Sequence, residues 1–247
     1  SDQGRAFAVN GSLSKGKLRG VGFIFVLCFL ISSVLFLPID VEYVIYAILL
    51  FAMMISGYLD DASKTPWNEY KKGLIDLVIS VVAVLTYMNF NSTTICFGAD
   101  EIVIPKALFL ILGVILIWVS VNVTNCTDGV DGLCASLCSV TLLAFGVLFA
   151  PILQKYAMAN FLFLSVLFAY LYFNSSPSSM LMGDAGSRAL GFYIAVIALK
   201  STHPFIYILL AAVMIVDGGI GLVKIALKRF LKISILKKTR TCLLYTS

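Results

Sequence analysis

The sequence predicts an all-α, polytopic transmembrane protein. Of its 247 residues, 60% are hydrophobic and 13% are charged, and the mean hydropathy is +1.00. Soluble domains carry about 25% charged residues. Apolar runs recur along the whole chain, and a helix needs about 20 mostly apolar residues to cross a bilayer. The short alternating segments of a membrane β-barrel are not found in the sequence. We therefore expect one integral-membrane domain over 1–247.

Eight apolar runs account for the predicted helices. They cover 20–37, 42–59, 73–90, 106–124, 133–152, 156–173, 188–200 and 204–228. The seventh run is short and ends at KSTHP. The eighth contains DGGIG at 217–221, whose glycines and charge are expected to loosen or break the helix.

Lysine and arginine predict the orientation of these spans, because cytoplasmic loops are enriched in both. With loops on alternating sides, fifteen of the 18 basic residues fall on one side and three (Lys106, Lys155 and Lys200) on the other. The first side is predicted to be cytoplasmic, including an N-terminal loop over 1–19 and a truncated loop over 229–247. The net charge of +5 then reflects topology. We expect no nucleic-acid partner, since no basic patch carries interleaved aromatic residues.

Three acidic motifs are predicted to lie on the cytoplasmic side. They are GYLDDASK (57–64), NCTDGVDGL (125–133) and MGDAGSRALG (182–191). Two predicted spans separate each motif from the next, so all three emerge at the same face. A single aspartate there is equally well explained by capping a helix or complementing its N-terminus. The set is better explained by function, because an ionisable residue at the centre of a membrane helix costs about 2.5–3.5 kcal/mol.

The spacing of the carboxylates indicates how they divide their roles. Asp60 and Asp61 are adjacent, so on a helix they point about 100° apart. One can then bind a cation while the other handles a proton or a substrate. Asp128 and Asp131 would share one face if their segment is helical. Asp184 is flanked by glycine and alanine, where the backbone is open to a ligand.

Carboxylates beside amides and a lysine are typical of a magnesium–phosphate site. Magnesium prefers carboxylate, water and phosphate oxygens. Lysine and magnesium together stabilise charge on a transferring phosphoryl group. The candidates near the carboxylates are Lys64, Asn122, Asn125 and Asn174. No GxxxxGK[ST] or GxGxxG fingerprint is present, which argues against the common soluble nucleotide-binding folds.

The same motifs carry a family resemblance. GYLDDASK, NVTNCTDGVDGL and FNSSPSSMLMGDAGSRALG resemble the three signature blocks of the polyprenyl-phosphate N-acetylhexosamine-1-phosphate transferases. The N-terminal LSKGKLRGVGFIF resembles the first cytoplasmic loop of that family, so the resemblance covers nearly the whole chain. Lys64, Thr127 and the pair Asn174 and Pro177 favour the members that use a UDP-MurNAc-pentapeptide donor.

The resemblance implies a reaction and its place in the cell. Phospho-N-acetylmuramoyl-pentapeptide is transferred from UDP-MurNAc-pentapeptide to undecaprenyl phosphate, a membrane lipid, giving lipid I and UMP, and Mg²⁺ is required. The enzyme would act in peptidoglycan synthesis, in the bacterial cytoplasmic (inner) membrane, with its active site facing the cytoplasm. The resemblance sets no oligomeric state and leaves a homodimer open.

The resemblance also implies roles for individual residues. Asp60, Asp61 and Asp184 are the implied catalytic residues and magnesium ligands. Whether Asp60 and Asp61 deprotonate the lipid phosphate or form a covalent intermediate stays open. The residues implied to bind substrate are Lys64, Asn122, Asn125, Asp128, Asp131, Asn174 and Leu181.

The sequence departs from the family pattern in several places. The family's first span is missing, as are its His-rich last cytoplasmic loop and final span, so about eight of ten expected helices are seen. Because the chain also lacks an initiator Met, we expect it to be a piece of a longer protein. Leu181 stands where many members have an aromatic residue that stacks on uracil. Arg188 stands where leucine is common, and either snorkels towards phosphate or follows the positive-inside bias. Asp217 either reaches the site or has a packing or helix-breaking role in the last span.

Two other functions are compatible with the sequence. A relative that uses UDP-N-acetylglucosamine or another UDP-sugar would carry similar motifs. An ion-coupled transporter would also need aspartates, but its carboxylates are expected near the membrane midplane. The three acidic motifs are instead predicted at one face, which favours the transferase.

Overall fold

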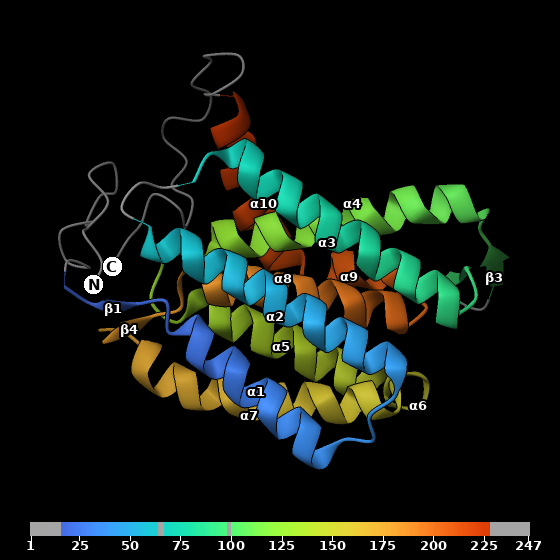
Figure 1. Ribbon diagram of the computed structural model, residues 1–247, viewed down its shortest axis with the longest axis horizontal. Coiled ribbons are helices and arrows are strands. Elements are labelled where there is room, and N and C mark those ends of the chain that lie inside the picture. The colour runs from blue at the N-terminus through green and yellow to red at the C-terminus, as the bar shows by residue number, and fades with distance from the viewer. Residues whose placement is uncertain (1–15, 64–66, 98–99, 228–247) are drawn as a thin grey trace.

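The computed structural model describes residues 16–63, 67–97 and 100–227, and most of its regular structure is helical (Figure 1). The helices are α1 (Gly22–Phe36), α2 (Val41–Ala62), α3 (Glu69–Phe90), α4 (Lys106–Thr127), α5 (Leu133–Leu148), α6 (Ala150–Leu153), α7 (Lys155–Asn174), α8 (Gly183–Lys200), α9 (Pro204–Leu210) and α10 (Ala212–Ala226). Within the described ranges the strands are β1 (Leu18–Arg19), β2 (Thr94–Phe97), β3 (Asp100–Val103) and β4 (Met180–Leu181).

Several helices are long and apolar enough to cross a membrane. By length and composition, four in the described ranges qualify: α2, α3 over Tyr70–Phe90, α4 and α7. The bent pair α9–α10 is a fifth if it counts as one span, and α1 and α5 are shorter apolar helices. The eight predicted runs match α1, α2, α3, α4, α5, α7, α8 and the α9–α10 pair in order. The prediction of a polytopic helical membrane protein is therefore confirmed.

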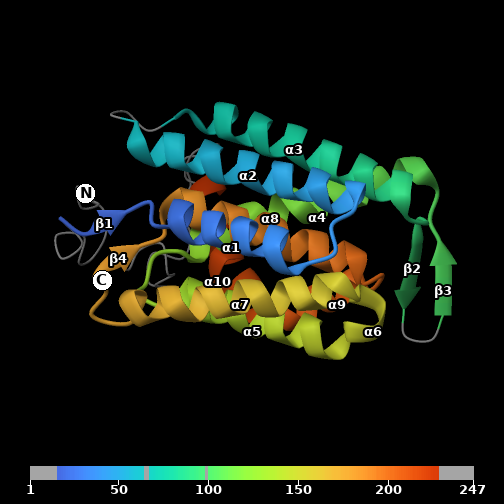
Figure 2. The same ribbon diagram turned by 60° about the horizontal axis from the view of Figure 1, so that its bottom comes forward.

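Helix α8 lies at the centre of the bundle (Figures 1 and 2). Every residue from Gly183 to Leu199 is buried, and the helix packs mainly against α2 and α4. Small residues make this packing possible, as is common between membrane helices. A Cβ at Gly191 would lie 2.7 Å from the carbonyl oxygen of Ser120 on α4, whose hydroxyl donates to the Gly191 carbonyl at 2.8 Å. Helix α8 therefore sets the positions of its neighbours.

The structure corrects two predicted boundaries. The seventh helix begins at Gly183 and not at residue 188, so Asp184 lies in its first turn, where a carboxylate complements the helix N-terminus. The eighth run bends by 85° at Ala211, between α9 and α10, and not at DGGIG. Gly218 of that motif lies inside α10, and a Cβ there would come within 2.2 Å of the Val123 carbonyl oxygen on α4. The glycine serves close packing of two helices and does not break one.

The two ends of the bundle carry different structures. At one end β1 and β4 form a parallel pair, with Arg19 opposite Leu181. At the other end β2 and β3 form an antiparallel hairpin (Figure 2). We call the first the motif end, because residues 57–63, 125–133 and 182–191 lie there, and the second the hairpin end.

A buried ion pair joins three helices at the hairpin end. Lys200, the last residue of α8, lies 3.1 and 3.0 Å from the two carboxylate oxygens of Glu42 on α2. Lys200 also donates to the Asn91 side-chain oxygen at 2.7 Å, and the Asn91 amide donates to Glu42 at 2.7 Å. Asn91 follows α3 directly. The network therefore satisfies the buried charges and ties α2, α3 and α8 together.

We expect Lys200→Met to destabilise the protein by about 3–5 kcal/mol, because it leaves the Glu42 carboxylate buried without its counter-charge. The matched control is Lys155→Met at the same end, since Lys155 pairs with Asp40, whose side chain is 52% exposed. An exposed pair contributes about 0–1 kcal/mol. Thermal unfolding in one detergent compares the two variants, and equal shifts of the midpoint would contradict the prediction.

Candidate active site

A short parallel strand pair builds one wall of the site. Leu18 pairs with Met180 and Arg19 with Leu181, and the pairing continues as Val21 N–H donates to the Leu181 carbonyl at 3.2 Å. The N-terminal segment thereby lies beside the motif that begins α8. Although β1 and β4 are far apart in sequence, their pairing brings Arg19 close to carboxylates from two other elements, α2 and α8.

Three carboxylates converge at the motif end, bridged by two cations. Lys72 forms an ion pair with Asp60, at the end of α2, and its Nζ lies 3.3 Å from Oδ2 of Asp184 in the first turn of α8. Arg19 Nη2 lies 2.9 Å from Oδ1 of Asp61 and 3.5 Å from Oδ1 of Asp184. Asp60 and Asp61 thus have different cationic partners, and Asp184 is shared by both cations. The structure therefore brings together the three residues predicted to be catalytic.

Backbone groups and glycines hold this arrangement in place. Asp61 Oδ2 accepts from the Ala185 N–H at 3.3 Å, at the N-terminus of α8. Gly183 has φ +67°, and a Cβ there would lie 2.3 Å from Oδ2 of Asp61. A Cβ at Gly57 would lie 2.4 Å from the carbonyl oxygen of Asp184. Glycine at these two positions allows α2 and α8 to approach until their carboxylates share partners.

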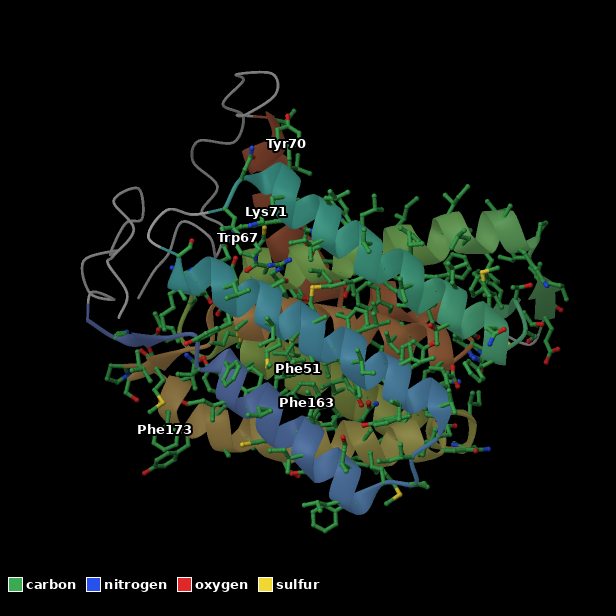
Figure 3. The ribbon with its side chains drawn as sticks, in the orientation of Figure 1. Phe51, Trp67, Tyr70, Lys71, Phe163 and Phe173 are labelled. Carbon is green, nitrogen blue, oxygen red and sulfur yellow. The ribbon has the colours of Figure 1, made fainter. Side chains whose placement is uncertain are left out.

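Aromatic residues at the start of α3 indicate how deep in the membrane the site lies. Trp67, Tyr70 and Lys71 lie together there (Figure 3). The backbone N–H of Trp67 donates to Oδ1 of Asp60 at 2.7 Å, and Lys71 Nζ lies 3.5 Å from the centre of the Trp67 ring. Trp and Tyr are enriched where membrane meets water, and Tyr70 is 74% exposed. This agrees with a site at the membrane–water boundary.

A second polar cluster surrounds Asp131. Its carboxylate accepts from the Ser178 N–H at 2.9 Å and from the Ser178 hydroxyl at 2.7 Å. Lys17 Nζ lies 3.5 Å from Asp131 and donates to the Ser178 hydroxyl at 2.8 Å. The cluster therefore connects the N-terminal segment, the α4–α5 connection and the segment before β4.

Two predicted asparagines position backbone segments around the carboxylates. Asn174 accepts from the Gly132 N–H at 3.0 Å and donates to the Met180 carbonyl at 2.8 Å. Asn125 accepts from the Ser187 hydroxyl on α8 at 3.0 Å. Asn174 therefore ties the α4–α5 connection to β4, and Asn125 ties the end of α4 to α8.

The other predicted substrate-binding residues are arranged less tightly. Asn122 donates to the Trp118 carbonyl of its own helix at 2.8 Å. Asp128 is the C-cap of α4 and begins a connection of turns, so the condition for Asp128 and Asp131 to share a helical face is not met. Leu181 lies half-buried in β4. Lys64 lies outside the described residues.

The motifs did not predict several side chains that the structure places in these clusters. Lys17, Arg19 and Lys72 had been used only to predict orientation, and Ser178 had not been considered. The available signal was that these three cations lie at the same end as the aspartates. Asp76 was missed although an ionisable residue inside an apolar run indicates function.

Arg188 has a partner that the sequence did not indicate. Its guanidinium forms a buried ion pair with Asp76 on α3, and its two expected roles, snorkelling towards phosphate or following the positive-inside bias, stay predictions. The leucine that the resemblance leads us to expect at this position would remove this counter-charge from Asp76. The role of Asp217, which lies within α10, stays a prediction.

The arrangement is dominated by ion pairs between side chains. In the part of the chain that the structure describes, no three His, Cys, Asp or Glu side chains are already arranged to hold a metal ion. Lys72 and Arg19 instead bridge the three carboxylates. The donor set is nevertheless made of hard oxygens, which is the chemistry that magnesium prefers.

Comparison with known proteins shows which family the chain belongs to. The model of glycosyl transferase family 4 matches residues 43–202. A phospho-N-acetylmuramoyl-pentapeptide-transferase of Treponema pallidum (strain Nichols) is 36% identical over 97% of this chain and 72% of its own length. Proteins with the same name from Microcystis aeruginosa and Halalkalibacterium halodurans are 31% and 29% identical, over 74% and 87% of this chain and 53% and 71% of their own lengths.

The fold and the matches define a membrane-embedded transferase, and the chain belongs to glycosyl transferase family 4. Its curated relatives named above are phospho-N-acetylmuramoyl-pentapeptide-transferases, so the resemblance predicted from the three motifs is confirmed. Membership of an enzyme family also decides against an ion-coupled transporter.

We expect Gly183→Ala to lower the thermal unfolding midpoint, because a side chain at a strained φ costs about 1–3 kcal/mol and the new Cβ would collide with Asp61. The matched control is Gly219→Ala in α10, where nothing lies within 4 Å of an added Cβ. Alanine there gains about 1 kcal/mol in helix propensity. Both variants are unfolded in the same detergent; a midpoint for Gly183→Ala at or above that of the control would refute the assignment of Gly183.

Proposed function

We propose that the protein transfers phospho-N-acetylmuramoyl-pentapeptide from UDP-MurNAc-pentapeptide to undecaprenyl phosphate, giving lipid I and UMP. The names of the relatives support this reaction. The observation that carries it is the convergence of Asp60, Asp61 and Asp184 with Arg19 and Lys72 at one end of an apolar bundle. Such a cluster suits two substrates that both carry phosphate.

A magnesium ion is part of the proposal. Asp184, with Asp60 or Asp61, would hold it, because these carboxylates are already drawn together by shared cations. When bound, Mg²⁺ neutralises charge on the diphosphate and polarises a phosphoryl oxygen. The donor chemistry fits, since carboxylate, water and phosphate oxygens make up the usual shell of this ion.

The two cations are proposed to bind phosphate oxygens. The Arg19 guanidinium presents a planar fork of donors that matches phosphate geometry, whereas Lys72 acts as a compact point charge. Both now neutralise carboxylates, so a negatively charged diphosphate offers them alternative partners. Lys17, held by Asp131 and Ser178, adds a third positive charge on the neighbouring wall.

The site's location suits a lipid acceptor and a water-soluble donor. Apolar helices lead to it from one side, and the loops of the motif end surround it. The excess of basic residues on this side indicates the cytoplasm, and the relatives are bacterial. We therefore propose the cytoplasmic face of the bacterial inner membrane, where a nucleotide-linked donor and a lipid phosphate can meet.

Asp184→Asn in the full-length protein is expected to reduce UMP release by about a hundredfold or more, the loss seen when a group that stabilises transition-state charge is removed. UMP is measured with UDP-MurNAc-pentapeptide, undecaprenyl phosphate and Mg²⁺. Asp100→Asn in the exposed hairpin is the matched control and should retain activity. Undiminished release from Asp184→Asn would remove its catalytic assignment.

The same assay distinguishes a transferase that uses UDP-MurNAc-pentapeptide from one that uses UDP-N-acetylglucosamine. UDP-N-acetylglucosamine is supplied in parallel as the donor, and we expect no UMP from it. Release with this donor alone would show that the protein is a UDP-N-acetylglucosamine-dependent relative.

Arg19→Gln is expected to raise the KM for the nucleotide donor by about tenfold, because a hydrogen bond to a charged group contributes about 1.5–3 kcal/mol. Arg19→Lys keeps the charge without the fork and should retain part of the affinity. Lys106→Gln, at the hairpin end, removes a charge far from the site and serves as control. A KM in Arg19→Gln that matches the control would argue against phosphate binding by Arg19.

A further inference from the structure

A second ion pair lies deeper in the bundle, between Asp76 on α3 and Arg188 on α8. Their side chains are 3% and 2% exposed, and Nη2 of Arg188 donates to Oδ1 of Asp76. Nη1 of Arg188 is buried, with no hydrogen-bond partner among the described residues. Two opposite charges are therefore enclosed within helices whose surroundings are mostly apolar.

This pair lies one helical turn further into the bundle than the pair formed by Lys72 and Asp184 at the active site. Lys72 and Asp76 are four residues apart on α3, and Asp184 and Arg188 are four residues apart on α8, so each helix presents its two charges on one face. The upper contact joins Lys72 to Asp184, and the lower joins Asp76 to Arg188. Asp76 also interacts electrostatically with Lys72 and Asp184. We call these four side chains the charge ladder; its upper rung is Lys72 with Asp184, and its lower rung is Asp76 with Arg188.

The ladder bridges helices that are not close neighbours. Helix α8 packs mainly against α2 and α4, and α3 packs on the outer side of those two (Figure 1). The long side chains of Lys72 and Arg188 cross the intervening space. Apolar side chains would hold two helices together as well or better than a buried ion pair, so stability does not explain the lower rung.

We propose that Asp76 and Arg188 form a positioning pair that orients Lys72 and Asp184 for the diphosphate. This inference rests on the proposed function. The lower rung fixes how α3 and α8 face each other one turn away from the reacting groups. It also sets the charge beside each of them: negative below Lys72 and positive below Asp184. The pair acts through these two residues and does not itself touch the substrate.

The first test compares two double substitutions in the full-length protein. Asp76→Leu with Arg188→Leu removes the lower rung, and Glu42→Leu with Lys200→Leu removes the ion pair at the opposite end of α8. Both should fold, because apolar replacement of a buried ion pair is often neutral or stabilising. The first should lower kcat for UMP release by about tenfold to a hundredfold, as small misplacements of reacting groups do, and raise the half-saturating Mg²⁺ concentration. The second should leave both unchanged.

The second test reverses the pair, with Asp76→Arg and Arg188→Asp together. A pair that only ties helices works equally well when reversed. A positioning pair does not, since the reversal places an arginine one turn from Lys72 and an aspartate one turn from Asp184. We expect the folded reversed variant to lose UMP release, with a midpoint lowered only by the modest cost of two like-charge pairs one helical turn apart, and Arg188→Lys alone to retain part of the activity.

The outcomes separate this inference from the function it rests on. Wild-type kcat and Mg²⁺ dependence in the apolar double variant, or in a folded reversed variant, would overturn the positioning role while leaving the transferase assignment intact. An unaltered protein that releases no UMP would contradict the proposed function, and this inference would fall with it.

Discussion

The pairing of buried charge at the start of α8 is the interaction on which the motif end depends. Asp184 is 6% exposed and lies between Arg19 and Lys72. A carboxylate withdrawn from water is stable only when it is paired and hydrogen-bonded. Lys72 is 112 residues from Asp184 along the chain, so this requirement selects a tertiary arrangement. It joins β1, α2, α3 and α8 at the place where the acidic motifs meet.

Close backbone packing is what makes the pairing geometrically feasible. A Cβ at Gly22 would lie 2.1 Å from the amide nitrogen of Gly186, and one at Gly57 would lie 2.4 Å from the Asp184 carbonyl oxygen, so α1 and α2 both approach α8 closely. With backbones this near, short aspartate side chains from two helices reach the same cation. Small residues around α8 therefore determine packing and chemistry together, and a larger side chain at these glycines would move the carboxylates as well as the helices.

The sequence predicts the arrangement of the helices better than it predicts the partners of individual side chains. The order of the helices follows from the lengths of the apolar runs. The gathering of the motifs at one end follows from the even number of predicted spans between them. Both can be read directly from the sequence. The partners of Asp60 and Asp61 cannot be predicted in this way, because they depend on the β1–β4 pairing and on how α3 lies beside α2. The bend at Ala211 was misplaced to DGGIG because glycine signals both a break and close packing. Lys64 lies outside the described residues, so its predicted role stays a prediction.

On the proposed function, the balance of charge explains why this site carries its own cations. Three carboxylates face two positive side chains, and in a poorly solvated region the remaining negative charge is unfavourable without compensation. A divalent ion alone would compete with Arg19 and Lys72 for the same oxygens. If metal and diphosphate bound together, Asp184 with Asp60 or Asp61 would hold the ion, and the phosphate oxygens would become new partners for Arg19 and Lys72. The site would then favour metal and nucleotide together over either one alone, which couples occupancy of the metal site to the presence of the donor.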